Sequence, residues 1–183
     1  MPTPNDVTSR PHETEVARDP LRSIANQLSS PRVDMGLLAA LRRFNPLTDG
    51  RHSLFETQKV LLNAGIDLSA DSQSQQRWAL IVHCLAIVRG AHHGQRDTGA
   101  KLAGLGLSEG RLRQLIEADG PLLCDLLPTL ARRLAAASVT LNWWPLAELA
   151  LTLDDEDGRA RSQRARLQIV QGFLRATATK ASA

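Results

Sequence analysis

The sequence predicts an all-α protein, a compact bundle of about eight helices with no sheet. Aromatic residues make up only 3% of the chain, with three Trp, three Phe and no Tyr, whereas strand-rich domains rely on aromatic and β-branched side chains. Apolar residues make up 43%, which is typical of a globular protein. No segment alternates apolar and polar residues as a half-buried strand does. A chain of 183 residues therefore suits one helical domain that needs no disulfide or metal to fold.

The two ends of the chain differ in composition from its middle. The first 18 residues carry three prolines and scattered charges, which predicts a disordered leader over 1–18 rather than a signal peptide. We expect the helical domain to span 19–178 and a disordered tail to span 179–183. No run reaches the roughly 18 apolar residues of a membrane span. Because Cys84 and Cys124 lie in apolar runs, as buried free thiols do, we expect a cytoplasmic protein without a membrane partner.

The first half of the domain contains four predicted helices, at 21–28, 32–44, 53–63 and 73–90. The first two helices are expected to end before Pro31 and Pro46, because the residue that precedes a proline avoids the helical conformation. Ser53 and Glu56 have the spacing of a capping box, and Gly65 follows the end of that helix. The fourth helix is apolar on nearly all sides, which is typical of a central core helix.

The second half contains helices predicted at 98–105, 109–117, 119–134, 142–149 and 154–178. Capping residues precede four of them (Asp97 or Thr98, Ser108, Asp119 and Asn142). Pro128 lies inside the third helix of this set and is expected to kink it. An acidic run at 154–157 suits the positive N-terminus of the last helix.

Positive charge is carried mainly by arginine. The net charge is only +3, but 19 of the 22 cationic residues are Arg. Arginine binds phosphate and carboxylate through a planar fork, although a GC-rich coding bias accounts for part of this excess. A net charge of this size does not by itself indicate a nucleic-acid-binding protein. The evidence for such a protein must come from whether the cationic residues are clustered.

The arginines are clustered in three places: around the helix at 32–44, at the end of the helix at 119–134, and over 159–166. Such clusters are commonly solvated helix surfaces; their functional interpretation is contact with phosphates without reading of bases. The few aromatics argue against a single-strand binder that stacks bases. The candidate phosphate contacts are Arg42, Arg43, Arg51, Arg132, Arg133, Arg161 and Arg164.

Catalytic and metal sites find little support. His83 and Cys84 are adjacent in the central apolar helix, whereas a catalytic Cys–His pair is adjacent in space rather than in sequence. His92 and His93 have no Cys or carboxylate at metal-ligand spacing. The chain contains no phosphate loop and no nucleophile elbow. We therefore expect no catalytic residue, no metal and no cofactor.

A helix-turn-helix transcriptional regulator is the alternative. Two short helices flank the turn at 106–108, and the second carries Arg111 and Arg113 on its exposed side. A DNA-reading unit would place that second helix in the major groove. However, Ala103 and Gly106 are three residues apart, whereas the usual unit spaces its small residue and turn glycine four apart.

Four segments together resemble the CasB family, the small subunit of type I-E CRISPR surveillance (Cascade) complexes. They are Arg77-Trp-Ala-Leu-Ile-Val-His83, the segment from Leu102 to Asp119, the Leu- and Arg-rich helix from Leu126 to Ala135, and Val139-Thr-Leu-Asn-Trp143. Their order and spacing carry the resemblance, which covers roughly 32–174. Trp143-Trp144-Pro145 and Pro128 are local departures from the family pattern.

This resemblance implies an all-helical, non-catalytic subunit that acts in antiviral defence. Two copies would pack head to tail beside the backbone and large subunits of the complex. Basic surface residues would contact the heteroduplex of crRNA and target DNA and the displaced non-target strand. Such contacts would stabilise the R-loop and be independent of sequence, because base pairing supplies the specificity.

Overall fold

The computed structural model describes residues 19–43, 54–67, 72–152 and 158–181. Within these ranges the chain forms helices and no strand, which confirms the all-α prediction. The helices are α1 (Pro20–Ser29), α2 (Met35–Arg43), α3 (Leu54–Asn63), α4 (Ser72–Ile87), α5 (Thr98–Gly104), α6 (Glu109–Glu117), α7 (Gly120–Ala136), α8 (Trp144–Leu151) and α9 (Arg159–Ala181).

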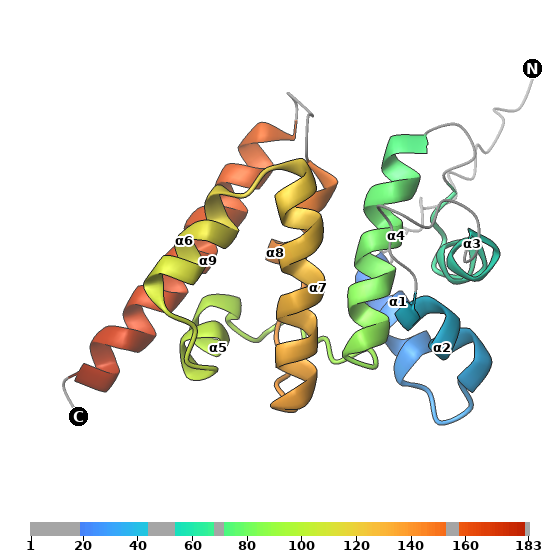
Figure 1. Cartoon of the computed structure of the whole chain (residues 1–183), viewed down its shortest axis with the longest axis horizontal. Coiled ribbons are helices and arrows are strands. Elements are labelled where there is room, and N and C mark those ends of the chain that lie inside the picture. Colours follow the sequence, from blue (N-terminus) through green and yellow to red (C-terminus); the bar gives the residue numbers. More distant parts are fainter. Residues whose placement is uncertain (1–18, 44–53, 68–71, 153–157, 182–183) are drawn as a thin grey trace, which may run out of the picture.

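Helix α4 connects the two halves of the fold (Figure 1). It packs against α1, α2 and α3 on one side and against α7 and α8 on the other. Its side chains from Ala79 to Ala86 are all buried, including both predicted candidates for chemistry, His83 and Cys84. The apolar character on nearly all sides of this helix therefore reflects neighbours on two sides, as predicted for a central helix.

Two of the predicted capping residues, Asp97 and Ser108, accept hydrogen bonds from the main-chain N–H three residues on, as N-cap residues do. Asp19, for which no cap was predicted, does the same at the start of α1. Asp119 occupies the N-cap of α7 but makes no such bond. Helix α8 begins at Trp144, and the side chain of Asn142 accepts a bond of 3.0 Å from the Trp144 N–H.

Helices α7 and α9 differ in detail from their predicted bounds. Helix α7 continues past the buried Pro128 to Ala136. Helix α9 begins at Arg159, and the acidic run expected to start it lies outside the described residues. At its other end α9 reaches Ala181, and the Lys180 ammonium donates to the carbonyl oxygen of Ala103 on α5.

The face of α9 that packs inward carries Ala165, Ile169 and Phe173. Leu167 and Leu174, which form the other apolar stripe of the helix, are about half exposed (53% and 51%). The inward face is selected by the close approach of α5. A Cβ atom on Gly99 would collide with the α9 backbone, so glycine permits this approach. None of the described helices is both long and apolar enough to cross a membrane.

Candidate nucleic-acid interface

Two of the candidate arginines, Arg42 and Arg132, approach the second half of α4 from different helices, and Arg43 follows Arg42 at the end of α2. Arg42 and Arg43 end α2, and the Nε atom of Arg42 donates to the carbonyl oxygen of Ala86 at 2.8 Å. Arg132 approaches from α7, where it is close enough to His83 for its charge to act on the histidine. Arg43 and Arg132 are exposed. Two helices that are remote in sequence therefore place positive charge beside the second half of the central helix.

Arg42 and Arg133 also hold the fold together. The Arg42 guanidinium is half-buried against α4. The Nη2 atom of Arg133 lies 3.3 Å from the carbonyl oxygen of Leu105 and 3.2 Å from that of Gly106. These carbonyls lie just after the end of α5, where helices leave main-chain acceptors without an intrahelical donor. Both side chains thus have a structural role beside the proposed binding role. Arg51 lies outside the described residues.

Arg161 and Arg164 lie apart from that group, on the first turns of α9. In Figure 1 α9 begins toward the upper end of the molecule, whereas α2 and the end of α4 lie toward the lower end. Their side chains line a groove of about 410 Å³ between α8 and α9. We call this the α8–α9 groove and define it by Trp144, Pro145, Glu148, Arg161, Arg164 and Gln168.

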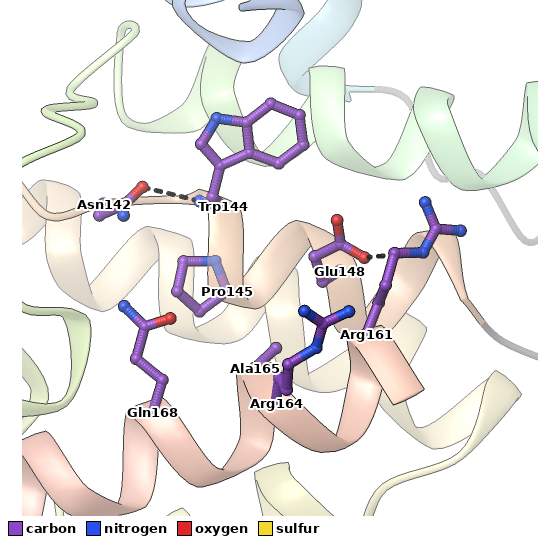
Figure 2. Close-up of a pocket in the computed structure, with 8 residues that line it drawn as sticks. All are labelled: Asn142, Trp144, Pro145, Glu148, Arg161, Arg164, Ala165 and Gln168. Atoms are coloured by element: carbon purple, nitrogen blue, oxygen red, sulfur yellow. Dashed lines mark hydrogen bonds and ion pairs between the residues drawn. The ribbon is translucent and has the colours of Figure 1, made fainter. Parts of the chain in front are cut away.

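The α8–α9 groove combines charges of both signs, whereas the Trp144 ring at its edge points away from the two arginines (Figure 2). The Arg161 Nε atom lies 3.9 Å from Oε2 of Glu148, an oxygen that is buried and has no hydrogen-bond partner among the described residues. The Arg164 Nε atom donates to the carbonyl oxygen of Ala160 in its own helix. The Trp144 indole N–H donates to Asp19 at 3.0 Å, which fixes the orientation of the ring.

Sequence reasoning selected the two arginines of this groove but not Trp144 or Gln168. With only 3% aromatic residues in the chain, Trp144 belongs to no repeated aromatic pattern that would indicate a binding site. One signal was nevertheless present, because Trp144 and Pro145 fall where the chain departs from the CasB pattern.

His83 and Cys84 are packed in the core, whereas His92 is half-buried and His93 is exposed. The Nδ1 atom of His83 lies 2.7 Å from the carbonyl oxygen of Leu41, and the Cys84 side chain is fully buried. Burial raises the pKa of the Cys84 thiol well above its usual range, so it is a poor nucleophile. His92 accepts a hydrogen bond from the Trp143 N–H at its Nδ1 atom. In the part of the chain that the structure describes, no three His, Cys, Asp or Glu residues are grouped to hold a metal ion.

The helices of the suspected helix-turn-helix pack on different neighbours. Helix α5 packs mainly against α9, and α6 packs against α7. Arg111 and Arg113 on α6 are exposed, as predicted, but so are Glu109 and Glu117 on the same helix. The acidic side chains weaken the positive potential that a recognition helix needs.

A comparison with protein-family models matches residues 37–173 to the family described as CRISPR-associated protein Cse2. The chain belongs to this family. Cse2, also called CasB, is the small subunit of type I-E Cascade, which confirms the resemblance of the four sequence segments. Comparisons with curated proteins and with solved structures gave no match.

Membership of the Cse2 family assigns the chain as a CRISPR Cascade small subunit. The family is a structural component of the complex and is not known as an enzyme. The first family segment has a structural role in this chain: the Nη1 atom of Arg77 donates to the carbonyl oxygen of Leu151 at the end of α8. This hydrogen bond joins α4, which contains the segment from Arg77 to His83, to α8, which directly follows the segment from Val139 to Trp143.

Proposed function

We propose that the chain binds the crRNA–target DNA heteroduplex and the displaced strand through their phosphates and stabilises the R-loop. The observation that carries this proposal is that two helices packed against α4 carry exposed arginines, Arg43 at the end of α2 and Arg132 on α7, in a Cse2-family fold. Arg42, Arg51, Arg133, Arg161 and Arg164 complete the proposed contact set. Phosphate contacts position a protein without reading sequence, which suits a complex whose guide supplies specificity.

The proposed partners are the backbone and large subunits of Cascade, a second copy of the chain, the crRNA and both DNA strands, in the cytoplasm. The net charge of +3 supports only weak binding by the chain alone. Neighbouring protein subunits would hold the basic surface against the nucleic acid, and the exposed acidic residues would face those subunits.

The test is a salt titration of target DNA binding by the assembled Cascade. Each phosphate contact contributes roughly 0.7–0.9 to the slope of log K against log[salt]. The double variant Arg43→Ala/Arg132→Ala is expected to lower that slope by about 1.4–1.8. The control Arg111→Ala/Arg113→Ala removes the same charge from exposed sites on α6 and should leave the slope unchanged. Equal slopes for the first variant and the native complex would refute the proposed contacts.

A further inference from the structure

A cavity between α1 and the loop that follows α4 is not used by the proposed contact set. Its volume of about 420 Å³ falls in the range of small-ligand pockets. In Figure 1 this loop leaves the lower end of α4, the end toward which α2 also lies. We call the cavity the α1–loop pocket and define it by the polar side chains that line it: Asp19, Arg22, Asn26, His92, His93 and Gln95.

The loop side of this pocket is fixed by contacts with two other parts of the chain. The backbone at Gly90 approaches α1 so closely that a Cβ atom there would collide with the α1 main chain. The His93 N–H donates to the carbonyl oxygen of Leu141 at 3.0 Å, and the Trp143 indole N–H donates to the carbonyl oxygen of Ala91 at 3.1 Å. Because these contacts hold the loop without a ligand, binding requires little additional ordering of the main chain.

The pocket contains hydrogen-bond donors that no described residue uses. The Arg22 side chain is exposed and makes no hydrogen bond or ion pair with another described residue. The Asn26 and Gln95 amides are also exposed. His92 accepts the Trp143 N–H at Nδ1, so its neutral ring carries the proton on Nε2, which is a donor. One charged group and several neutral donors therefore line the same cavity.

We propose that the α1–loop pocket binds one phosphate group of the nucleic-acid backbone, with Arg22 as the charged contact and Asn26 and Gln95 as neutral donors. This inference rests on the proposed function, because it adds a phosphate contact outside the seven arginines named there. Phosphate and sugar groups in nucleic-acid complexes are contacted by arginine and by asparagine and glutamine amides. The polar lining of the pocket has this composition, and it includes the His92–His93 pair that lacks metal-ligand spacing.

Asp19 is the acidic residue among those that line the pocket, and its charge is already partly offset. Its Oδ1 atom accepts hydrogen bonds from the Arg22 N–H at 3.1 Å and from the Trp144 indole N–H at 3.0 Å. Asp19 also occupies the N-cap of α1, where the positive end of the helix dipole favours a carboxylate. Asp19 therefore repels an anion less than an unpaired carboxylate does, and the Arg22 guanidinium stays available to a ligand.

A nucleic acid is favoured over an acidic protein segment as the source of the anion. The core of a protein interface is apolar, whereas the lining of this pocket contains only Ala25 and Gly94 besides its six polar residues. A phosphate backbone requires only positive charge and hydrogen-bond donors. An acidic segment of a neighbouring subunit is the alternative occupant, and the experiment separates the two.

The experiment measures target DNA binding by assembled Cascade as the salt concentration is varied. Arg22→Ala, at an exposed position, should lower the slope of log K against log[salt] by about 0.7–0.9, the contribution of one phosphate. Arg22→Lys keeps the charge and should keep the native slope. Arg111→Ala removes the same charge from an exposed site on α6 and is the matched control, which should also show the native slope.

The neutral donors give a second readout. Asn26→Ala and Gln95→Ala each remove a hydrogen bond but no charge, so each should weaken target DNA binding about two- to tenfold without changing the salt slope. Circular dichroism of the purified full chain checks that each variant is folded. If Arg22→Ala does not fold, the two amide variants and Arg22→Lys carry the test.

A native salt slope in the folded Arg22→Ala variant would overturn the inference, and so would native affinity in both amide variants. Loss of the Arg22→Ala chain from purified Cascade would also overturn it, because that result assigns the pocket to a neighbouring subunit. None of these results affects the proposed contacts of Arg43 and Arg132, which have their own variant. Conversely, an unchanged slope in that variant would refute those contacts whatever Arg22→Ala shows.

Discussion

The guanidinium group of Arg133 lies 3.3 Å from the carbonyl oxygen of Leu105, just after α5 ends. The preceding residue, Arg132, is exposed to solvent. Consecutive residues on a helix point about 100° apart, because a turn takes 3.6 residues. A pair of arginines that looks uniform in the sequence is therefore divided into one that supports the α5–α6 turn and one that is available to a ligand.

Replacement of Arg133 is expected to destabilise the fold. Arg133→Ala removes the donors to Leu105 and Gly106, which should lower the free energy of unfolding by about 1–2 kcal/mol. Arg132→Ala should change it by less than about 0.5 kcal/mol, as exposed substitutions do. Urea unfolding of both variants measures the difference. Equal stability of the two variants would contradict the structural role of Arg133.

The close crossing of α5 and α9 gives a second stability test. A Cβ atom on Gly99 would collide with the main chain of Ile169 and Phe173, so Gly99→Ala should destabilise the fold by about 1–3 kcal/mol, the cost of overpacking. A Cβ atom on Gly104, in the same helix, would meet no atom within 4 Å. Gly104→Ala is the matched control and should be neutral or stabilising by up to about 1 kcal/mol. Thermal unfolding of the two variants measures the difference in stability. A Gly99→Ala variant as stable as the native chain would exclude this close packing of α5 on α9.

The stability of the fold should decrease in mild acid. Burial lowers the pKa of His83 from its ordinary value of about 6.5, and burial likewise lowers that of His92. As the pH falls below about 6.5, the unfolded chain binds protons that the folded chain does not, so the unfolded state is favoured. Urea unfolding at about pH 5.5 should therefore give a lower free energy than at about pH 7.5.

His83→Gln tests the contribution of this residue to that pH dependence. The glutamine amide can still donate to the carbonyl oxygen of Leu41 but does not titrate. The difference in stability between the two pH values should shrink in this variant and persist in part through His92. A pH difference as large as in the native chain would exclude His83 as a source.

The two cysteines should differ in reactivity. Cys84 is fully buried, whereas Cys124 is only partly buried, and burial raises the pKa of both thiols. In the native chain iodoacetamide should modify Cys124 slowly and Cys84 not measurably. In urea both should react, which mass spectrometry of the peptides records. Fast native labelling of Cys84 would revive the enzyme hypothesis that its packing opposes.

The sequence predicts helices better than it predicts which side chains are available to a ligand. Periodicity identified α4 as central because neighbours on both sides leave an apolar pattern on nearly all faces. For α9 the sequence contains an apolar stripe with Leu167 and Leu174, but the structure leaves both side chains about half exposed and buries Ile169 and Phe173 instead. The inward face depends on the contact of α9 with α5 at Gly99, between segments 70 residues apart, which no local pattern encodes.

The arginine candidates show the same limit. Clustering selected Arg42 and Arg133 together with Arg43 and Arg132, but only the folded chain shows that the first two donate to main-chain carbonyls. Only part of the α8–α9 groove could be predicted from the sequence. Its arginines are clustered in one segment, whereas Trp144 lies in another helix.

The transcriptional-regulator alternative leads to the last prediction, which concerns duplex DNA. A regulator would protect a specific site, whereas a subunit that contacts phosphates binds duplexes of different sequence equally. We expect the purified chain to give no footprint on a random library of duplexes and equal affinity for scrambled sequences. Arg111→Ala/Arg113→Ala tests the second helix of the suspected unit and should not change that affinity, because Glu109 and Glu117 share its exposed surface. A reproducible protected sequence that this variant loses would favour the regulator, since only a helix that reads bases in the major groove produces it.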